Sequence, residues 1–306
     1  MIHSANLPDI VKVHVQTISD HLLQNTGVSV DVLRLDKIHT IISGNKWFKL
    51  KYYLQQVSEQ RKAGIVTFGG AYSNHLIATA YSCKLLGISS VGVVRGEEPP
   101  IYSPTLRDVQ SYGMKLDFVA RTKYHDDEFI TQLKQTYQDF IFIEEGGRGD
   151  AGIKGAEEIL QLTNLDAYSH IMCAVGTGTM MTGIINSSLP TQRVIGVPVL
   201  KMTNGGSTMI EEYVQSKTAS DNFEFQHAFH FGGYAKKKRE LIEFMNAFYD
   251  GHSIPTDFVY TGKLFFAAMK LIEDRFFTPG ANILVIHSGG LQGNRSLPTG
   301  ELHFTY

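Results

Sequence analysis

The sequence predicts an α/β protein built from two doubly wound, open-sheet domains. Short apolar, β-branched runs alternate with helical stretches along the chain, and this alternation is typical of a parallel sheet with helices on both faces. The chain has 306 residues. Because globular domains usually contain roughly 100–200 residues, this length favours two domains with a cleft between them.

Eight apolar runs are expected to form strands. Each run is continuously apolar, which is the pattern of a parallel strand buried on both faces of its sheet. The expected strands cover residues 30–35, 65–68, 90–94, 116–120, 140–143, 170–175, 194–199 and 283–286.

Five stretches between these runs are expected to form helices. In residues 74–86, Leu76, Ile77, Ala80 and Cys83 recur at helical spacing, and Gly87 follows where a left-handed residue would end the helix. The other expected helices cover residues 126–137, 155–162, 236–247 and 262–274.

Two glycine-containing stretches are the candidate domain boundaries, at 43–44 and at 146–149. The sequence contains no low-complexity linker and no repeat of fixed period. We therefore expect residues 1–45 and 149–306 to form a large domain that uses both chain ends. Residues 46–148 would form a smaller inserted α/β domain.

The composition argues against several classes of function. A net charge of −2 indicates neither a nucleic acid nor an anionic membrane as partner. The one dense basic cluster, residues 236–239, has no accompanying aromatic residues for base stacking and is expected to be a solvated helix face. No apolar stretch reaches about 18 residues, and no basic start precedes a long apolar run. A cytoplasmic location is therefore expected.

Neither metal chemistry nor disulfide formation is expected. Cys83 and Cys173 lie in apolar stretches without a second nearby cysteine, which indicates buried reduced thiols. His227 and His230 are three residues apart, but no further ligand pattern accompanies them.

Four glycine-rich segments follow apolar strands and predict a site for a phosphate-bearing small molecule. They are GGAYSN at 69–74, GGRG at 146–149, GTGT at 176–179 and SGG at 288–290. Ligands of open parallel sheets bind beyond the carboxyl ends of the strands. Glycine lets backbone N–H groups approach a phosphate closely, and the N-terminus of a following helix favours the anion.

Nucleotide ligands fit these segments poorly. The P-loop pattern is absent, and the third glycine of residues 176–183 is one position late for a dinucleotide fingerprint. No acidic ribose partner occurs near residues 197–199, about 20 residues further on. A smaller phosphate cofactor such as pyridoxal 5′-phosphate (PLP) remains.

PLP requires a lysine whose amine can hold it covalently. Lys46, Lys49, Lys51 and Lys263 are the candidates near glycine-containing turns. Lys46 is favoured because a Gly-Asn turn places it at a helix start, where the helix dipole disfavours an ammonium and lowers its pKa. Lys49 and Lys51 would be solvated or would face the phosphate.

Residues 43–50, SGNKWFKL, resemble the G-G-N-K-x-x-K-L segment of the 1-aminocyclopropane-1-carboxylate (ACC) deaminase / D-cysteine desulfhydrase family. These are PLP-dependent enzymes of fold type II, similar to the tryptophan synthase β subunit. Three further segments resemble the family in the same order: residues 69–75, 259–263 and 286–290. The resemblance covers about residues 30–295. It implies a large PLP-binding domain, a cofactor in the interdomain cleft and a homodimer.

The resemblance also implies which residues bind the cofactor. Lys46 would hold PLP covalently and remove the substrate α-proton, and Asn74 would bond to the ring hydroxyl. The phosphate would lie in a cradle formed by Gly176, Thr177, Gly178 and Thr179. Either Ser288 or Thr261 would meet the pyridine nitrogen.

On the substrate side the resemblance implies three residues. Ser73 would face the substrate carboxylate or assist the lysine, although a helix N-cap is its alternative role. Tyr260 would act on the substrate as acid, base or nucleophile. Tyr234 resembles a second active-site tyrosine, and a packed surface aromatic residue is the alternative. Tyr72 stands where the family has glutamine, which changes the side chain expected near the substrate carboxylate.

Thr261 separates the two activities of the family. ACC deaminases have a glutamate at the equivalent position, whereas a threonine hydroxyl cannot keep the pyridine nitrogen protonated. The weaker electron sink favours a D-cysteine desulfhydrase-like β-elimination that yields pyruvate and ammonia. The alternatives are ACC deamination, which yields 2-oxobutanoate and ammonia, and a PLP-binding protein without turnover.

Overall fold

The computed structural model describes residues 8–200 and 206–305, and within them it has two β-sheets covered by helices. The strands are β1 (Val15–Ile18), β2 (Ser29–Arg34), β3 (Gly64–Gly69), β4 (Ser89–Arg95), β5 (Lys115–Val119), β6 (Phe140–Ile143), β7 (His170–Val175), β8 (Arg193–Pro198), β9 (Phe223–Phe225) and β10 (Asn282–His287). The helices are α1 (His21–Thr26), α2 (Asn45–Glu59), α3 (Asn74–Leu86), α4 (Pro104–Ser111), α5 (Asp127–Thr136), α6 (Asp150–Ala156), α7 (Thr179–Ser187), α8 (Gly206–Ser216), α9 (Arg239–His252) and α10 (Thr261–Glu273).

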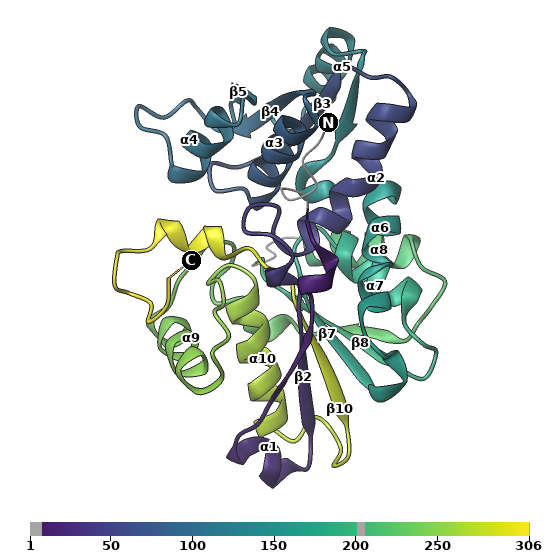
Figure 1. Cartoon of the computed structure of the whole chain (residues 1–306), viewed down its shortest axis with the longest axis vertical. Helices are drawn as coiled ribbons and strands as arrows, with labels where there is room; N and C mark the ends of the chain where they lie inside the picture. The colour runs from purple at the N-terminus through teal and green to yellow at the C-terminus, as the bar shows by residue number, and fades with distance from the viewer. Residues whose placement is uncertain (1–7, 201–205, 306) are drawn as a thin grey trace.

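The two sheets confirm the predicted α/β class. The larger sheet has the order β1-β2-β10-β7-β8-β9 and is parallel except for β1, which pairs antiparallel with β2. The smaller sheet has the order β5-β4-β3-β6 and is entirely parallel. In Figure 1 the smaller sheet lies at the top with α3, α4 and α5, and the larger sheet lies below.

All eight expected strands form, each within one residue of its predicted ends. The sequence did not predict β1 and β9, which lie at the two edges of the larger sheet. Both are short and largely half-buried, with the polar residues Gln16, Thr17 and Glu224 inside them. Such edge strands lack the continuous apolar run by which the other strands were recognised.

The helix predictions need two corrections. α3 has the predicted bounds, and Gly87 ends it with φ of 67°, as expected. Residues 155–162 do not form one helix: α6 begins earlier, at Asp150, and a separate 3-10 helix covers Ile159–Leu162. α9 begins at Arg239, so residues 236–238 precede the helix and do not form its face. Glu157 and Glu158 lie between the two segments, and the backbone after them has 3-10 geometry.

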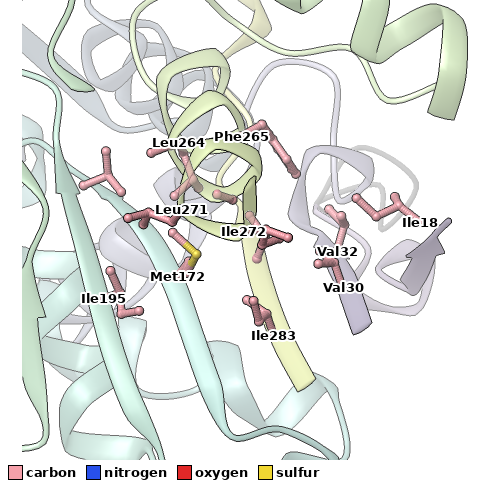
Figure 2. Close-up of a cluster of buried hydrophobic side chains, with 14 of the residues drawn as sticks. Ile18, Val30, Val32, Met172, Ile195, Leu264, Phe265, Leu271, Ile272 and Ile283 are labelled. Atoms are coloured by element: carbon pink, nitrogen blue, oxygen red, sulfur yellow. The ribbon is translucent and has the colours of Figure 1, made fainter. Parts of the chain in front are cut away.

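The core of the larger sheet fixes the position of α10. Figure 2 shows Leu264, Leu271 and Ile272 of this helix among Met172 of β7 and Ile283 of β10. Met172, Leu264 and Ile283 are fully buried. Burial of each such aliphatic side chain contributes roughly 1.5–3 kcal/mol. The N-terminal residues of α10 are therefore held firmly against the sheet.

Helix α2 packs closely against α6, and Gly155 allows this approach. A Cβ atom on Gly155 would lie 1.7 Å from the carbonyl oxygen of Phe48. Residues 64–143 supply all strands of the smaller sheet, and residues 15–34 and 170–287 supply those of the larger sheet. The expected domain boundaries, after residues 45 and 148, stay predictions.

Two expectations of the sequence analysis concern membrane-spanning helices and an N-terminal targeting signal. Within residues 8–200 and 206–305, no helix is long and apolar enough to cross a membrane. The N-terminal segment considered for a targeting signal, residues 1–7, lies outside the described residues.

Candidate active site

A cavity of about 900 Å³ lies where the carboxyl ends of strands from both sheets meet. All four glycine-rich segments contribute to its lining. They follow β3, β6, β7 and β10. The cavity thus lies where the rule for open parallel sheets places a ligand site.

Lys46 projects from the first turn of α2 into this cavity. Its Nζ donates a hydrogen bond of 2.8 Å to Asn45 Oδ1 and lies 5.9 Å from the centre of the Tyr260 ring. Burial lowers the pKa of Lys46 to about 8, and the Asp257 carboxylate partly opposes this shift. About a tenth of this lysine is therefore an unprotonated amine at pH 7, far more than for a lysine of ordinary pKa.

Gly44 fixes the start of the helix that carries Lys46. Its φ is 60°, and a Cβ atom there would lie 1.8 Å from the carbonyl oxygen of Ser288. The backbone N–H of Asn45 donates a 3.1 Å hydrogen bond to that same oxygen. The start of α2 and the loop after β10 are therefore joined directly below the cavity.

The loop after β7, named the glycine cradle here, leads into the N-terminus of α7. Gly176, Thr177 and Gly178 line the cavity, and the Thr177 and Thr179 hydroxyls are 3.1 Å apart. Thr179 is fully buried and supports the loop from behind. The N–H groups of a helix N-terminus bind phosphate readily.

Lys49 lies in the same cavity and Lys51 does not. Lys49 is buried, and burial together with the nearby Lys46 holds its pKa well below the usual value. Lys51 instead forms an ion pair with Glu158. Of the two alternatives considered for these lysines, facing a phosphate is open only to Lys49.

Ser73 and Asn74 begin helix α3 at the edge of the cavity. Ser73 is the N-cap: its Oγ accepts hydrogen bonds of 3.2 Å from the N–H groups of His75 and Leu76. The Ser73 proton remains available to a ligand. Asn74 donates through Nδ2 to Gly290 O at 3.3 Å, whereas its buried Oδ1 has no protein partner. This oxygen can therefore accept a hydrogen bond from a ligand in the cavity.

Tyr234 and Tyr260 both line the cavity and lie edge to face, with ring centres 6.2 Å apart. Burial raises the pKa of both phenols, and for Tyr260 the rise is large. Both side chains are therefore neutral hydroxyls that can donate a proton. Tyr234 is 41% exposed and packs on Tyr260, so its position fits both alternatives, an active-site tyrosine and a packed surface aromatic residue.

The family model of pyridoxal-phosphate-dependent enzymes matches residues 17–289 of the chain. The chain belongs to this family. A Pyrococcus abyssi protein that is provisionally named a 1-aminocyclopropane-1-carboxylate deaminase is 27% identical over 285 residues, covering 87% of this chain and 86% of that protein. A bifunctional D-cysteine desulfhydrase/1-aminocyclopropane-1-carboxylate deaminase of Arabidopsis thaliana is 24% identical, covering 87% of this chain and 73% of that protein.

A solved structure confirms the fold of this PLP-dependent enzyme. The crystal structure of an ACC deaminase homologue superposes with a TM-score of 0.78 at 22% identity, covering 95% of this chain and 94% of that one. The predicted PLP cofactor, the enzyme class and the fold-type-II architecture are thereby confirmed.

The cavity of this PLP enzyme fits its cofactor chemically. It combines an amine of lowered pKa, a glycine cradle at a helix N-terminus and the unpartnered Oδ1 of Asn74. The cradle is tightly packed at Gly178, where φ is 84° and a Cβ atom would lie 3.1 Å from both Tyr213 and Val214. The roles of the individual residues toward PLP stay predictions.

Thr261 does not lie where the sequence analysis expected it. It is fully buried and absent from the cavity lining. Its hydroxyl donates to Asp257 Oδ2 at 2.7 Å and accepts from the Asp257 N–H at 2.8 Å. The Thr261 hydroxyl therefore both donates to and accepts from Asp257. Ser288 lines the cavity, so it is the member of the predicted pair that faces it.

Sequence reasoning missed Asp257 and assigned no role to Lys263. Asp257 is fully buried, and its two carboxylate oxygens accept four hydrogen bonds, from the N–H groups of Val259, Tyr260 and Thr261 and from the Thr261 hydroxyl. Asp257 lies four residues before the start of α10, and Tyr260 occupies the N-cap position, so the usual capping signal does not mark this aspartate in the sequence.

Lys263 is likewise fully buried, and burial lowers its pKa to about 8. Its Nζ donates to Val199 O at 3.1 Å and to Gly233 O at 2.7 Å. Lys263 therefore anchors the loop that carries Tyr234 and does not itself line the cavity. Among the described residues, no group of three or more histidine, cysteine, aspartate or glutamate side chains could hold a metal ion.

Proposed function

We propose that this PLP-dependent enzyme is a deaminating lyase for a small amino acid and that it catalyses a D-cysteine desulfhydrase-like β-elimination. The observation that carries the proposal is the position of Lys46 Nζ, 5.9 Å from the Tyr260 ring centre, in a cavity that also contains the glycine cradle. The names of the relatives, ACC deaminase and D-cysteine desulfhydrase, support the same chemistry.

In this proposal the cofactor is held from three directions. Lys46 binds it covalently. Gly176, Thr177 and Gly178 bind its phosphate, Thr179 supports them from behind, and Lys49 faces the same phosphate. Asn74 bonds to its ring hydroxyl. Ser288 meets the pyridine nitrogen. Bound PLP supplies an electron sink for charge that develops at the substrate α-carbon.

The remaining residues act on the substrate. The substrate carboxylate binds at the N-terminus of α3, where Ser73 donates its hydroxyl proton. The Lys46 amine takes the α-proton, and general-base action of this kind contributes about 10²–10⁴ in rate. Tyr260, assisted by Tyr234, donates a proton to the leaving group. Loss of the β-substituent and addition of water then give pyruvate and ammonia.

β-Elimination is favoured over ring opening because a serine hydroxyl, not a carboxylate, is proposed at the pyridine nitrogen. A hydroxyl cannot keep that nitrogen protonated, which makes the cofactor a weaker electron sink. Elimination can proceed with a weaker sink, because the leaving group takes the electrons. ACC deamination to 2-oxobutanoate and ammonia is the second candidate, supported by the names of the relatives. Membership of the enzyme family and the paired tyrosines make a non-catalytic PLP-binding protein the weakest candidate.

The decisive experiment offers D-cysteine, L-cysteine, D-serine and ACC separately to the holoenzyme and measures pyruvate, 2-oxobutanoate and the visible absorbance. We expect D-cysteine to change the spectrum and release pyruvate. Lys46→Ala should abolish product, whereas Lys51→Ala, in the same helix but outside the cavity, should not. Turnover by Lys46→Ala would contradict the assigned role of Lys46. Release of 2-oxobutanoate from ACC alone would favour the second candidate.

The proposal also covers the oligomeric state, the location and the domain boundaries of the protein. We expect a homodimer, a cytoplasmic location and domain boundaries after residues 45 and 148, and gel filtration with light scattering tests the first of these.

A further inference from the structure

Arg95 and Arg121 line the cavity but have no part in the proposed reaction. Arg95 is the last residue of β4, and Arg121 follows β5 by two residues. Among the described residues, no carboxylate lies within 4.0 Å of either guanidinium. The Arg95 guanidinium instead lies 5.6 Å from the centre of the Tyr124 ring. Two exposed cations thus border a ligand cavity, and neither forms an ion pair with a described residue.

The order of strands in the smaller sheet tells which end of the ligand these arginines face. Along the sheet the order is β6-β3-β4-β5. The loop after β6 lies against the cradle, since a Cβ atom on Gly146 would be 2.9 Å from the Thr177 side chain. The loop after β3 carries Ser73, the proposed carboxylate site. Adjacent strands are about 4.8 Å apart, so Arg95 and Arg121 lie one and two strands further from the cradle.

The side chains around Arg95 and Arg121 carry a net positive charge. The one carboxylate among the cavity-lining residues is Glu145, and Lys237, the other lining cation of the outer cavity, already pairs with Glu301 at 2.8 Å. Burial and Glu145 raise the pKa of Tyr124, whereas Arg95 lowers it, so both charges act on the same region. One carboxylate offsets only one of the two guanidiniums.

We propose that Arg95 and Arg121 bind a second anionic group at the distal end of the substrate. The preferred substrate is then an amino acid whose β-substituent ends in a carboxylate or a similar oxyanion. Guanidinium groups bind such oxyanions through paired hydrogen bonds. The cavity of about 900 Å³ is at the upper end of the roughly 300–1,000 Å³ typical of ligand pockets, which leaves room for a substrate longer than cysteine beside the cofactor. This inference rests on the proposed function and specifies its substrate class.

The test compares two near-isosteric ligands, S-carboxymethylcysteine and S-carbamoylmethylcysteine, each as the D and the L form. They differ only in an anionic carboxylate and a neutral amide. Elimination from either transfers the α-proton to Lys46 and breaks the Cβ–S bond, and the sulfur leaves as the free thiol with a proton from Tyr260. Water then hydrolyses the remaining enamine to pyruvate and ammonia. Calorimetric binding to the holoenzyme and kcat/KM for pyruvate release are both measured.

We expect the holoenzyme to bind the carboxymethyl ligand about 10- to 100-fold more tightly than the amide, as for a hydrogen bond to a charged group. Arg95→Gln and Arg121→Gln should each reduce this preference, and the double variant should abolish it while binding of the amide stays unchanged. Arg239→Gln is the matched control, because its exposed side chain lies on α9 and pairs with Glu243. Thermal melting of each variant checks that folding is intact.

Two outcomes would overturn the inference. Equal binding of both ligands by the unmodified holoenzyme would show that the arginines do not select an anion. An equal loss for both ligands in the variants would show that the arginines bind the α-carboxylate. If no amino acid released an oxo acid, the proposed function would fail, and the calorimetric preference would still decide the role of the arginines.

Discussion

Replacement of Lys263 by methionine should change how the stability of the protein depends on pH. Lys263 is fully buried, and burial lowers its pKa from 10.5 to about 8. Between these two values the unfolded chain binds a proton that the folded protein has released. Stability therefore rises with pH in this window, and below about pH 8 the protonated lysine costs the folded state free energy.

The magnitude follows from the two pKa values. Integration of the proton linkage from pH 7 to pH 9.5 gives an increase of about 2 kcal/mol in the free energy of unfolding from this one residue. In Lys263→Met this increment should be absent. The other titrating groups remain in both proteins, so their contributions cancel when the two pH profiles are subtracted.

The assay is urea unfolding of both proteins at closely spaced pH values, followed by tryptophan fluorescence and circular dichroism. Lys134→Met, an exposed substitution in α5, is the control and should keep the profile of the unmodified protein. Parallel profiles for the unmodified protein and Lys263→Met would refute the reasoning. Because Lys263 anchors Gly233 beside Tyr234, the substitution should also raise KM.

Two further predictions concern residues on either side of the cavity. Cofactor uptake by the cofactor-free protein requires the free amine of Lys46, so the rate of uptake should rise with pH with a midpoint of about 8. Asp257→Asn should move this midpoint to lower pH, because the Asp257 carboxylate raises the pKa of Lys46. An unchanged midpoint would argue against that coupling. Gly155→Ala should destabilise the protein by roughly 1–3 kcal/mol in thermal or urea unfolding, since its Cβ would lie 1.7 Å from Phe48 O; Gly251→Ala, in open space on α9, is the control and should not lower stability.

The sequence predicted those parts of the fold in which one local signal decides the structure. A short continuous apolar run is typical of a strand buried on both faces of its sheet, and all eight runs predicted on this basis formed strands. β1 and β9 were not predicted because an edge strand is only partly buried and therefore tolerates polar residues such as Gln16 and Glu224. The end of α6 at Ala156 and the 3-10 helix that follows have no clear signal in the local sequence.

The candidate site was predictable as a set of loops but not as a set of contacts. Glycine-rich segments after parallel strands must gather at one edge of each sheet, which places all four beside the cavity. Which hydroxyl faces the ligand depends on competition for hydrogen bonds. Thr261 could not be separated from Ser288 in the sequence, because the group that occupies Thr261 is Asp257, four residues earlier. Arg95 and Arg121 follow strands too, but the glycine signal does not mark them.

The segment Val259–Lys263 illustrates how a family-like pattern can be mostly structural. Of its last four residues, Tyr260 alone lines the cavity. Thr261 completes the hydrogen bonds of Asp257, and a Cβ atom on Gly262 would lie 2.8 Å from Asp257 O and 2.9 Å from Met245 Sδ. Lys263 bonds to the loop that carries Tyr234. The three residues after Tyr260 therefore serve to hold the two tyrosines against each other, and a change in any of them should affect the reaction through the position of a phenol.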